Sequence, residues 1–260
     1  MYFGGIDIGS ATSKSIVLNE RGIVAAHIIE TGPLSQASAE SAMAGVLEKS
    51  GLRMSDLEYV VATGYGRINV PFAGELITEI ACHAKGVHFL FPRARTILDM
   101  GGQDCKAIRV DAEGNHMAFA MNDKCAAGTG RFLEVMAQLL KVPIEEIGPL
   151  SLQGSEDLKI SNVCTVFARS EAGRHLRKGV PKANILGGLH AATAERVFSL
   201  LKRVGIEPDF VISGGIAKNI GVVKRVEEKV GMRAFISEDP QIIGALGAAL
   251  FAREKAEKRR

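Results

Sequence analysis

A short segment that occurs twice in the chain constrains the fold more than any other feature. Residues 6–16 can be laid over residues 98–108 without a gap, and Asp, Gly, Lys and Ile coincide at fixed spacing. In both copies an apolar strand that carries an aspartate leads into a turn of small residues and then into a second strand. One such unit leaves a sheet face uncovered. The repeat therefore predicts two related β-β-β-α-β units.

The apolar periodicity predicts the same kind of elements around both copies of the repeat. Around the first copy we expect strands over 2–8, 14–18, 23–29 and 59–63, and helices over 36–50 and 75–84. Around the second copy we expect strands over 96–100, 106–110, 116–121, 210–212 and 234–236. Helices are expected over 131–141, 166–177, 183–204, 217–230 and 241–258.

Composition and length exclude several classes of protein. The chain has 260 residues, of which 47% are hydrophobic and 23% charged, as in ordinary globular proteins with a sizeable core. No apolar run approaches the roughly 18 residues that span a bilayer, and Asp7 interrupts the N-terminal apolar stretch, so we expect neither a membrane partner nor a secretory signal. Trp is absent, and the basic residues of 253–260 are typical of a solvated helix end. We therefore expect a cytoplasmic protein that binds no nucleic acid.

The two turns have the chemistry of phosphate-binding loops. Small residues let backbone N–H groups approach an anion closely. The first turn adds hydroxyl donors and a lysine, in Ser10, Thr12, Ser13 and Lys14. Asp7 and Asp99 cannot bind phosphate, but they can hold hydrated Mg²⁺. One such loop alone is as compatible with an ordinary β-turn. The pair favours two loops that close on a triphosphate from opposite domains, and the chain has no G-x-x-x-x-G-K-[ST] segment of a P-loop.

A third glycine pair, Gly214 and Gly215, follows a predicted strand and opens a predicted helix. Such a junction can pass under a flat adenine ring, although strand–Gly-Gly–helix junctions are common. Its position after both phosphate loops strengthens the interpretation that it contacts the adenosine.

These three elements resemble the phosphate-1, phosphate-2 and adenosine motifs of the actin, hexokinase and acetate kinase superfamily. Three further segments are more specific: Asn-Asp-Lys-Cys-Ala-Ala-Gly-Thr-Gly-Arg-Phe at 122–132, Cys-Thr-Val-Phe-Ala at 164–168, and Gly-Ala-Leu-Gly-Ala-Ala at 244–249. Together they resemble the activator component of 2-hydroxyacyl-CoA dehydratases, which is related to the ATPase subunits of benzoyl-CoA reductase. The resemblance runs from Gly5 to Ala252.

The resemblance implies an α/β fold, a duplicated actin/hexokinase-like (ribonuclease H-like) β-β-β-α-β-α ATPase. We expect one subdomain in residues 1–94 plus 243–260, and a second in 95–242 that carries the cluster cysteines. It further implies a homodimer with one [4Fe–4S] cluster between the chains, and ATP-driven transfer of single electrons to a partner dehydratase. A ferredoxin or flavodoxin would be the electron donor.

The resemblance also assigns residues to the nucleotide. ATP or ADP and Mg²⁺ would be bound by Gly9, Ser10, Ala11, Thr12, Ser13, Lys14, Asp99, Gly101, Gly102, Gly128, Thr129, Gly214, Gly215, Ala217, Asn219, Gln241 and Gly244. Asp7 would act on the phosphates through Mg²⁺ and water. Either Gln103 or Asp104 would orient the attacking water, because phosphoryl transfer depends mainly on positioning and charge.

The four cysteines show no C-x-x-C spacing, so the residues alone favour buried thiols for all of them. The resemblance instead assigns cluster ligation to Cys125 and Cys164, which both precede predicted helices. Two copies of the chain would then supply the four thiolates. Cys82 and His88 are six residues apart and do not share a helix face, which argues against a metal site there. Cys105 lies in the second phosphate loop and is expected to act as a small apolar residue.

One residue departs from the pattern of the family. Arg169 stands where an acidic residue is expected in the closest relatives. This leaves the electron acceptor open between a 2-hydroxyacyl-CoA dehydratase-like protein and a double-cubane cluster protein. A small-molecule kinase and a nucleotide-gated, actin-like assembly protein remain alternatives on the same fold.

Overall fold

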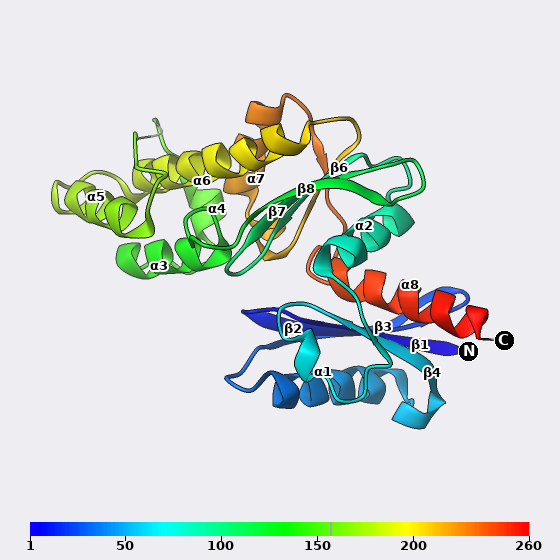
Figure 1. Cartoon of the computed structure of the whole chain (residues 1–260). Coiled ribbons are helices and arrows are strands. Elements are labelled where there is room, and N and C mark those ends of the chain that lie inside the picture. The colour runs from blue at the N-terminus through cyan, green and yellow to red at the C-terminus, as the bar shows by residue number, and fades with distance from the viewer. Residues whose placement is uncertain (157, 260) are drawn as a thin grey trace. The chain divides into compact units, whose positions relative to one another are not determined.

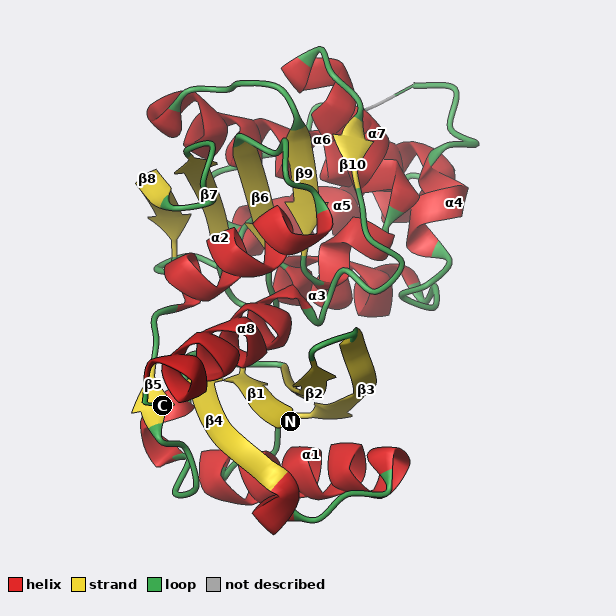
Figure 2. Cartoon of the chain, turned by 90° about the vertical axis from the view of Figure 1, so that its right-hand side faces the viewer, coloured by secondary structure: helices red, strands yellow, loops and turns green. Residues whose placement is uncertain are grey.

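The computed structural model describes residues 1–156 and 158–259, and these form two compact units. Unit 1 comprises Met1–Ala94, Val110–Met117 and the chain from Ser237 onward; unit 2 comprises Arg95–Arg109 and Ala118–Ile236. Figures 1 and 2 show that each unit contains one sheet with helices packed against it. Within the described part of the chain, no helix has the length and apolar character that a membrane crossing requires.

Unit 1 is built on a five-stranded sheet of order β3-β2-β1-β4-β5. Its strands are β1 (Tyr2–Ile8), β2 (Thr12–Asn19), β3 (Gly22–Glu30), β4 (Leu57–Thr63) and β5 (Glu75–Leu76), and its helices are α1 (Ser35–Ser50), α2 (Glu79–Leu90) and α8 (Ile243–Lys258), with short 3₁₀ turns at Met54–Asp56 and Arg67–Asn69. Helix α1 packs on one face of the sheet and α8 on the other, and α2 packs on α8 (Figure 1).

Two apolar clusters, one on each face of its sheet, form the core of unit 1. Phe3, Ile16 and Leu18 pack with α8, whereas Ile6 and Val17 pack with α1. Neighbouring residues of one strand thus serve opposite faces, as the period of two in a β-strand requires. Burial on both faces explains why β1 is almost wholly apolar.

Unit 2 is built on a sheet of order β10-β9-β6-β7-β8. Its strands are β6 (Thr96–Met100), β7 (Cys105–Val110), β8 (His116–Asn122), β9 (Phe210–Ser213) and β10 (Ala234–Phe235). Its helices are α3 (Gly130–Leu140), α4 (Ile147–Ser151), α5 (Thr165–Arg177), α6 (Lys182–Val204) and α7 (Ile220–Val230), with a 3₁₀ turn at Gly215–Lys218. The residues that connect β7 to β8 group with unit 1.

The two sheets repeat one topology. In each, three consecutive strands run antiparallel as neighbours, and the first of them also pairs in parallel with a later strand, β4 in unit 1 and β9 in unit 2. The register repeats as well, since Asp7 lies opposite Lys14 and Asp99 lies opposite Lys106. The α/β fold predicted from the internal repeat is confirmed.

One large apolar cluster holds unit 2 together. It joins Leu98, Met100 and Ala107 of the sheet to Phe132 and Met136 of α3, and extends over α6 and α7. Helix α5 packs between α3 and α6. The helix that carries the Cys164 segment therefore rests on two helices of unit 2.

Two element predictions were wrong in detail, and one short helix was missed. A helix from residue 75 was expected, but residues 75–76 pair with β4 as a strand and the helix begins at Glu79, capped by the Thr78 hydroxyl. A continuous helix over 217–230 was expected, but it is divided at Asn219, which caps α7. Helix α4 was not predicted, because a five-residue helix gives too short an apolar period to recognise.

Candidate nucleotide and metal sites

The first phosphate loop connects β1 to β2 in unit 1. The Gly9 N–H donates to the carbonyl of Thr12 (3.1 Å), which closes a tight turn with Ser10 and Ala11 exposed at its tip. Ser13 is buried and its hydroxyl is hydrogen-bonded to Thr31 (2.8 Å). The side chain of Ser13 thus anchors the loop, while the loop tip presents its backbone to solvent.

Asp7 lies at the carboxyl end of β1, buried beside this loop. Its Oδ2 is 3.2 Å from Nζ of Lys14, the residue opposite on β2. A methyl group placed on Gly244 would lie 3.0 Å both from Asp7 Oδ2 and from Nε2 of His83. Because Gly244 has no side chain, the first turn of α8 passes this carboxylate without crowding it. His83, on α2, was not predicted as a site residue, since a single histidine on an apolar helix carries no sequence signal.

The second phosphate loop connects β6 to β7 in unit 2 and has the same turn. The Gly101 N–H donates to the carbonyl of Asp104 (2.9 Å), with Gly102 and Gln103 between them. Gln103 is exposed. Because the turn closes as it does at Gly9, both copies of the repeat form the same structure.

A buried lysine distinguishes the second loop from the first. Lys106 Nζ is 2.8 Å from Asp104 Oδ2 and 3.6 Å from Asp99 Oδ2, so it lies between two carboxylates. Ser213 at the end of β9 donates to Asp99 Oδ1 (3.0 Å). Lys106 was not predicted as a site residue, although the repeat places it over Lys14. Asp104, one of two residues predicted to orient water, is held by this lysine.

The glycine pair after β9 lies against the second loop. Gly214 has φ +84°, and a side chain there would be 2.9 Å from Asp99 Oδ1 and would overlap the carbonyl oxygen of Met100. Gly215 is exposed, whereas Ala217 is buried. The Asn219 side chain accepts the Gly221 and Val222 N–H groups at the start of α7. Gln241 lies half-buried just before α8, in unit 1.

The four cysteines fall into two pairs. Cys82 and Cys105 are fully buried, and burial raises the pKa of Cys82 to about 12 and also raises the pKa of Cys105. Cys125 and Cys164 are partly exposed. High pKa and burial make the first pair inert, since the thiolate is the reactive and metal-binding form.

Cys125 and Cys164 lie on two loops of unit 2 that are in contact. Cys125 Sγ is 3.8 Å from the carbonyl oxygen of Val163, the residue before Cys164. Cys164 is the N-cap residue of α5, as predicted. Cys125 does not lie at a helix start, because four residues separate it from Gly130, the first residue of α3. Between Cys125 and α3, Gly128 and Thr129 form a buried turn in which the Thr129 hydroxyl donates to Ala126 O (2.6 Å).

Within residues 1–156 and 158–259, no group of three or more His, Cys, Asp or Glu side chains is arranged to hold a metal ion. The donor set that one chain offers near Cys125 is therefore two thiols. Their partial exposure leaves both accessible from outside the chain. This donor set fits a [4Fe–4S] cluster that receives two thiolates from each of two chains.

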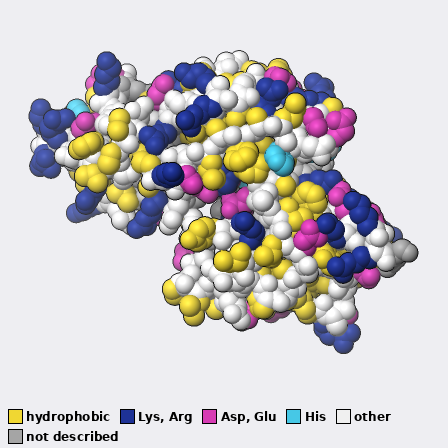
Figure 3. All heavy atoms as spheres, viewed as in Figure 1, with side chains coloured by type: hydrophobic (Ala, Val, Ile, Leu, Met, Phe, Trp, Pro, Cys, Tyr) yellow, Lys and Arg dark blue, Asp and Glu magenta, His cyan; other side chains and the backbone are white. Residues whose placement is uncertain are grey.

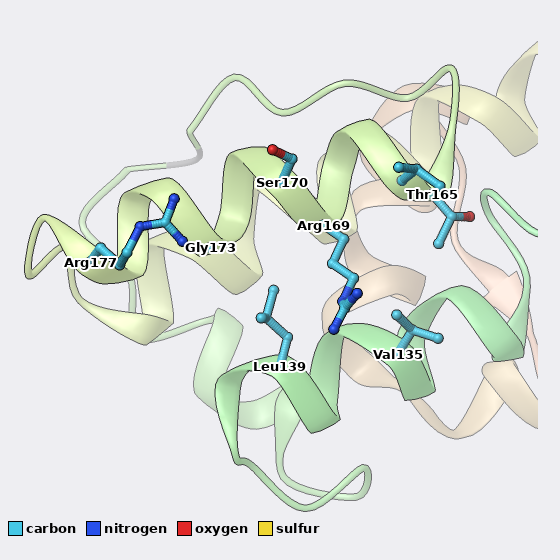
Figure 4. A pocket seen from close by; sticks show the side chains of 8 residues that line it. Val135, Leu139, Thr165, Arg169, Ser170, Gly173 and Arg177 are labelled. Carbon is cyan, nitrogen blue, oxygen red and sulfur yellow. The ribbon is translucent and has the colours of Figure 1, made fainter.

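Arg169 lies on α5, in a groove of about 540 Å³ between α3 and α5. Figure 4 shows Arg169 extending from α5 toward α3, where Val135 and Leu139 lie, whereas the Arg177 side chain lies along α5 near Gly173. Lys and Arg side chains gather on the end of unit 2 that carries α5 (Figure 3). Near Cys164 the surface is apolar, since Val163, Val166 and Phe167 are exposed by 61–70%.

Comparison with known proteins identifies the family. Residues 5–252 match the BadF/BadG/BcrA/BcrD ATPase family. The chain belongs to this family. It is 49% identical over 260 residues to the activator of lactoyl-CoA dehydratase from Anaerotignum propionicum, covering 100% of both chains. The predicted resemblance to activators of 2-hydroxyacyl-CoA dehydratases is thereby confirmed, and the chain is an ATPase by family.

Solved structures agree with this assignment. The activator of 2-hydroxyisocaproyl-CoA dehydratase from Clostridium difficile, with bound ADPNP, matches with TM-score 0.95 and 42% identity over 100% of this chain and 97% of that one. A ROK family glucokinase from Streptomyces griseus matches with TM-score 0.60 and 14% identity, covering 98% of this chain and 100% of that one. The second match shows the fold alone. The predicted actin/hexokinase-like fold is confirmed.

Proposed function

We propose that this ATPase is an ATP-dependent activator that delivers single low-potential electrons to a partner iron–sulfur protein. Two copies of the chain would share one [4Fe–4S] cluster. The observation that carries the proposal is the pair of accessible thiols, Cys125 and Cys164, on two touching loops of an ATPase unit. The relative from A. propionicum activates a lactoyl-CoA dehydratase, which supports an acceptor of the 2-hydroxyacyl-CoA dehydratase type. A double-cubane cluster protein is the alternative acceptor, and a ferredoxin or flavodoxin in the cytoplasm is the proposed donor.

Nucleotide binding uses both copies of the repeat. Backbone N–H groups of residues 9–14 and 101–104 bind the phosphates, and Gly214 and Gly215 contact the adenosine. The two ATPase subdomains correspond to residues 1–94 plus 243–260 and to 95–242. The bound ADPNP in the C. difficile activator supports an ATP-type ligand for this fold.

The carboxylates beside the two loops serve Mg²⁺. Asp7 Oδ2 pairs with the Lys14 ammonium (3.2 Å), and Asp99 Oδ2 lies 3.6 Å from the Lys106 ammonium while its Oδ1 accepts the Ser213 hydroxyl. We assign both carboxylates to Mg²⁺ through metal-bound water, a mode of binding that this cation favours. Gln103 is the better candidate to orient the attacking water. It is exposed in the loop, whereas the Asp104 carboxylate is engaged by Lys106.

The cluster cysteines set the quaternary structure. A [4Fe–4S] cluster takes four thiolates, and Cys125 and Cys164 of one chain supply two. The cluster, when bound, accepts and releases one electron at low potential. The Cys164 thiolate lies at the N-terminus of α5, where the helix dipole favours negative charge. The apolar side chains around it exclude water from the surface that a second copy or the acceptor would cover.

Anaerobic purification tests the proposal. The protein should be brown, with about four irons per two chains. Cys125→Ala and Cys164→Ala should each lose the stable cluster, whereas Cys82→Ala and Cys105→Ala, at buried thiols, should retain it. Iron analysis and the visible spectrum decide between these outcomes.

Sedimentation gives an independent measurement of the shared cluster. Removing the cluster should weaken the dimer, because ligation and assembly are thermodynamically linked. A monomer with its cluster intact would refute shared ligation. A colourless, iron-free protein that phosphorylates a small molecule would replace the proposal with the kinase function.

A further inference from the structure

The second phosphate loop is hydrogen-bonded directly to the start of α3. The Gly130 N–H donates to Gly101 O (3.0 Å), and the Arg131 N–H donates to Gly102 O (2.8 Å). Gly130 also lies close to the loop, since a side chain on it would be 3.3 Å from the Cα of Gly102. A movement of this loop's backbone would therefore act directly on the first two amides of α3.

The thiol of Cys105 makes a third connection between the same segments. Cys105 is the first residue of β7, fully buried, and its Sγ donates to Gly128 O (3.2 Å). Burial and the nearby Asp99 and Asp104 carboxylates raise the pKa of this thiol. The thiol therefore stays protonated and keeps its donor hydrogen. This is a specific polar role, whereas the sequence predicted only a small apolar residue.

The connection continues from Gly128 to Cys125. The turn at 126–129 is closed by the Thr129 N–H and hydroxyl, which both donate to Ala126 O. The Asn122 side-chain amide donates to Cys125 O (2.9 Å) and to Ala127 O (3.1 Å). These bonds hold the backbone at Cys125 and on its C-terminal side, and they tie it to Asn122, the last residue of β8.

Arg196 joins this loop to the one that carries Cys164. From α6, one guanidinium nitrogen donates to Asn122 Oδ1 and another to Asn162 O, both at 3.3 Å. Its aliphatic stem covers the turn, since a side chain on Gly128 would be 3.2 Å from Arg196 Cγ. A forked guanidinium can hold two acceptors at fixed spacing, which a lysine cannot do as well.

We propose that Cys105 and Arg196 are positioning residues for the two cysteine-bearing loops. Cys105 ties the Cys125 loop to the second phosphate loop, and Arg196 sets the spacing between the Cys125 and Cys164 loops. The proposal deepens the proposed function and rests on it. A movement of the second phosphate loop on nucleotide binding would reach the Cys125 loop through three hydrogen bonds of unit 2, which are made by the Gly130 N–H, the Arg131 N–H and the Cys105 thiol.

Amide hydrogen exchange of the anaerobically purified protein, followed by mass spectrometry, tests the role of Cys105. Cys105→Ala should raise exchange rates in residues 122–131 about two- to tenfold, the range set by loss of one net hydrogen bond. Cys105→Ser keeps a donor and should restore slow exchange. Cys82→Ala, at the other buried thiol, should leave 122–131 unchanged. Exchange in β9 and α7 serves as the reference for a general loosening of unit 2.

The role of Arg196 has its own matched pair of variants. Arg196→Met keeps the stem and removes both donors, and should raise exchange in 122–128 and in 158–164 together. Arg203→Met, at an exposed position of the same helix, should change neither segment. Exchange raised equally throughout unit 2, or unchanged in both segments, would overturn the assignment.

Adding Mg²⁺ and ADPNP separates failure of this inference from failure of the proposed function. In the unmodified protein the nucleotide should slow exchange at 9–14 and 101–104 and change it at 122–131. Cys105→Ala should lose the response at 122–128 and keep it at the phosphate loops and at Gly130 and Arg131, whose amides still donate to the second loop. A response at the loops without one at 122–131 in the unmodified protein would refute the connection. No response at either loop would refute the nucleotide site itself.

Discussion

Replacing Lys106 with Met removes the buried cation of the second phosphate loop and keeps the length of the side chain. The Lys106 side chain is 4% exposed and that of Asp99 is 5% exposed, with 3.6 Å between Nζ and Oδ2. Lys106 also holds Asp104 at 2.8 Å. Lys106→Met therefore leaves a buried carboxylate without its counter-charge, beside a second carboxylate.

The size of the effect follows from this burial. Breaking a buried ion pair by removing one partner costs about 3–5 kcal/mol. The Asp104 side chain is 29% exposed and can turn to solvent, so we expect the lower end, about 3 kcal/mol. For a chain of this size that corresponds to a fall in Tm of roughly 6–12 °C. Thermal unfolding of the anaerobic protein, followed by circular dichroism, gives the measurement.

Two further variants make the result specific. Asp99→Asn combined with Lys106→Met removes both charges and should recover at least half of the loss. Lys14→Met, at the equivalent place in unit 1, should cost less, because Lys14 contacts one carboxylate and its side chain is 13% exposed. A Tm of Lys106→Met within about 1 °C of the unmodified protein, or a double variant no more stable than the single one, would refute this reasoning.

Four other changes have defined outcomes. Asn219→Ala should destabilise by about 1 kcal/mol in thermal unfolding and Asn219→Asp should not, because Asp also caps α7. Gly244→Ala, whose methyl group would lie 3.0 Å from Asp7 Oδ2, should slow ATP hydrolysis while circular dichroism stays unchanged. Asp7→Asn should slow hydrolysis at least tenfold (~1.4 kcal/mol in the barrier) in a phosphate-release assay; an unchanged rate would count against the Mg²⁺ assignment. Burial raises the pKa of Cys82 from 9.0 to about 12, so as pH rises the thiol ionises in the unfolded chain before it ionises in the folded one. The free energy of unfolding should therefore fall as pH rises from 9 to 12, and Cys82→Ala should make this fall less steep.

The fold was largely predictable because its decisive signal is short and repeated. The aspartate, glycine and lysine of residues 6–16 and 98–108 specify a strand, a tight turn and a returning strand in one local stretch, and both sheets formed accordingly. Elements without such a local signal were misjudged. The pairing of residues 75–76 with β4 depends on a distant strand, and the division at Asn219 depends on a capping contact.

The residues predicted for the site lie in short sequence motifs, whereas residues that only folding brings close to them were missed. His83 reaches the surroundings of Asp7 from α2, and Arg196 reaches the Cys125 loop from a helix 71 residues further along the chain. Neither belongs to a motif. Lys106 is the exception: the repeat already placed it over Lys14, so the alignment of the two copies contained a signal for its role.

The two copies of the repeat form the same loop, but the side chains and segments that contact this loop differ between the two units. In unit 1, Lys14 faces one carboxylate, and the carboxylate lies close to His83 and to the first turn of α8. In unit 2, Lys106 is held between two carboxylates, and the loop is hydrogen-bonded to the segment that leads to Cys125. The backbone turns of the two loops are equivalent, as the bonds from Gly9 N–H to Thr12 O and from Gly101 N–H to Asp104 O show. Among the described residues, only the second loop has a hydrogen-bonded route to a cysteine loop. If ATP drives chemistry at the cysteines, the signal should therefore pass through unit 2. Variants that disturb the first loop should lower nucleotide binding, but the nucleotide that still binds should produce the same change in exchange at residues 122–131.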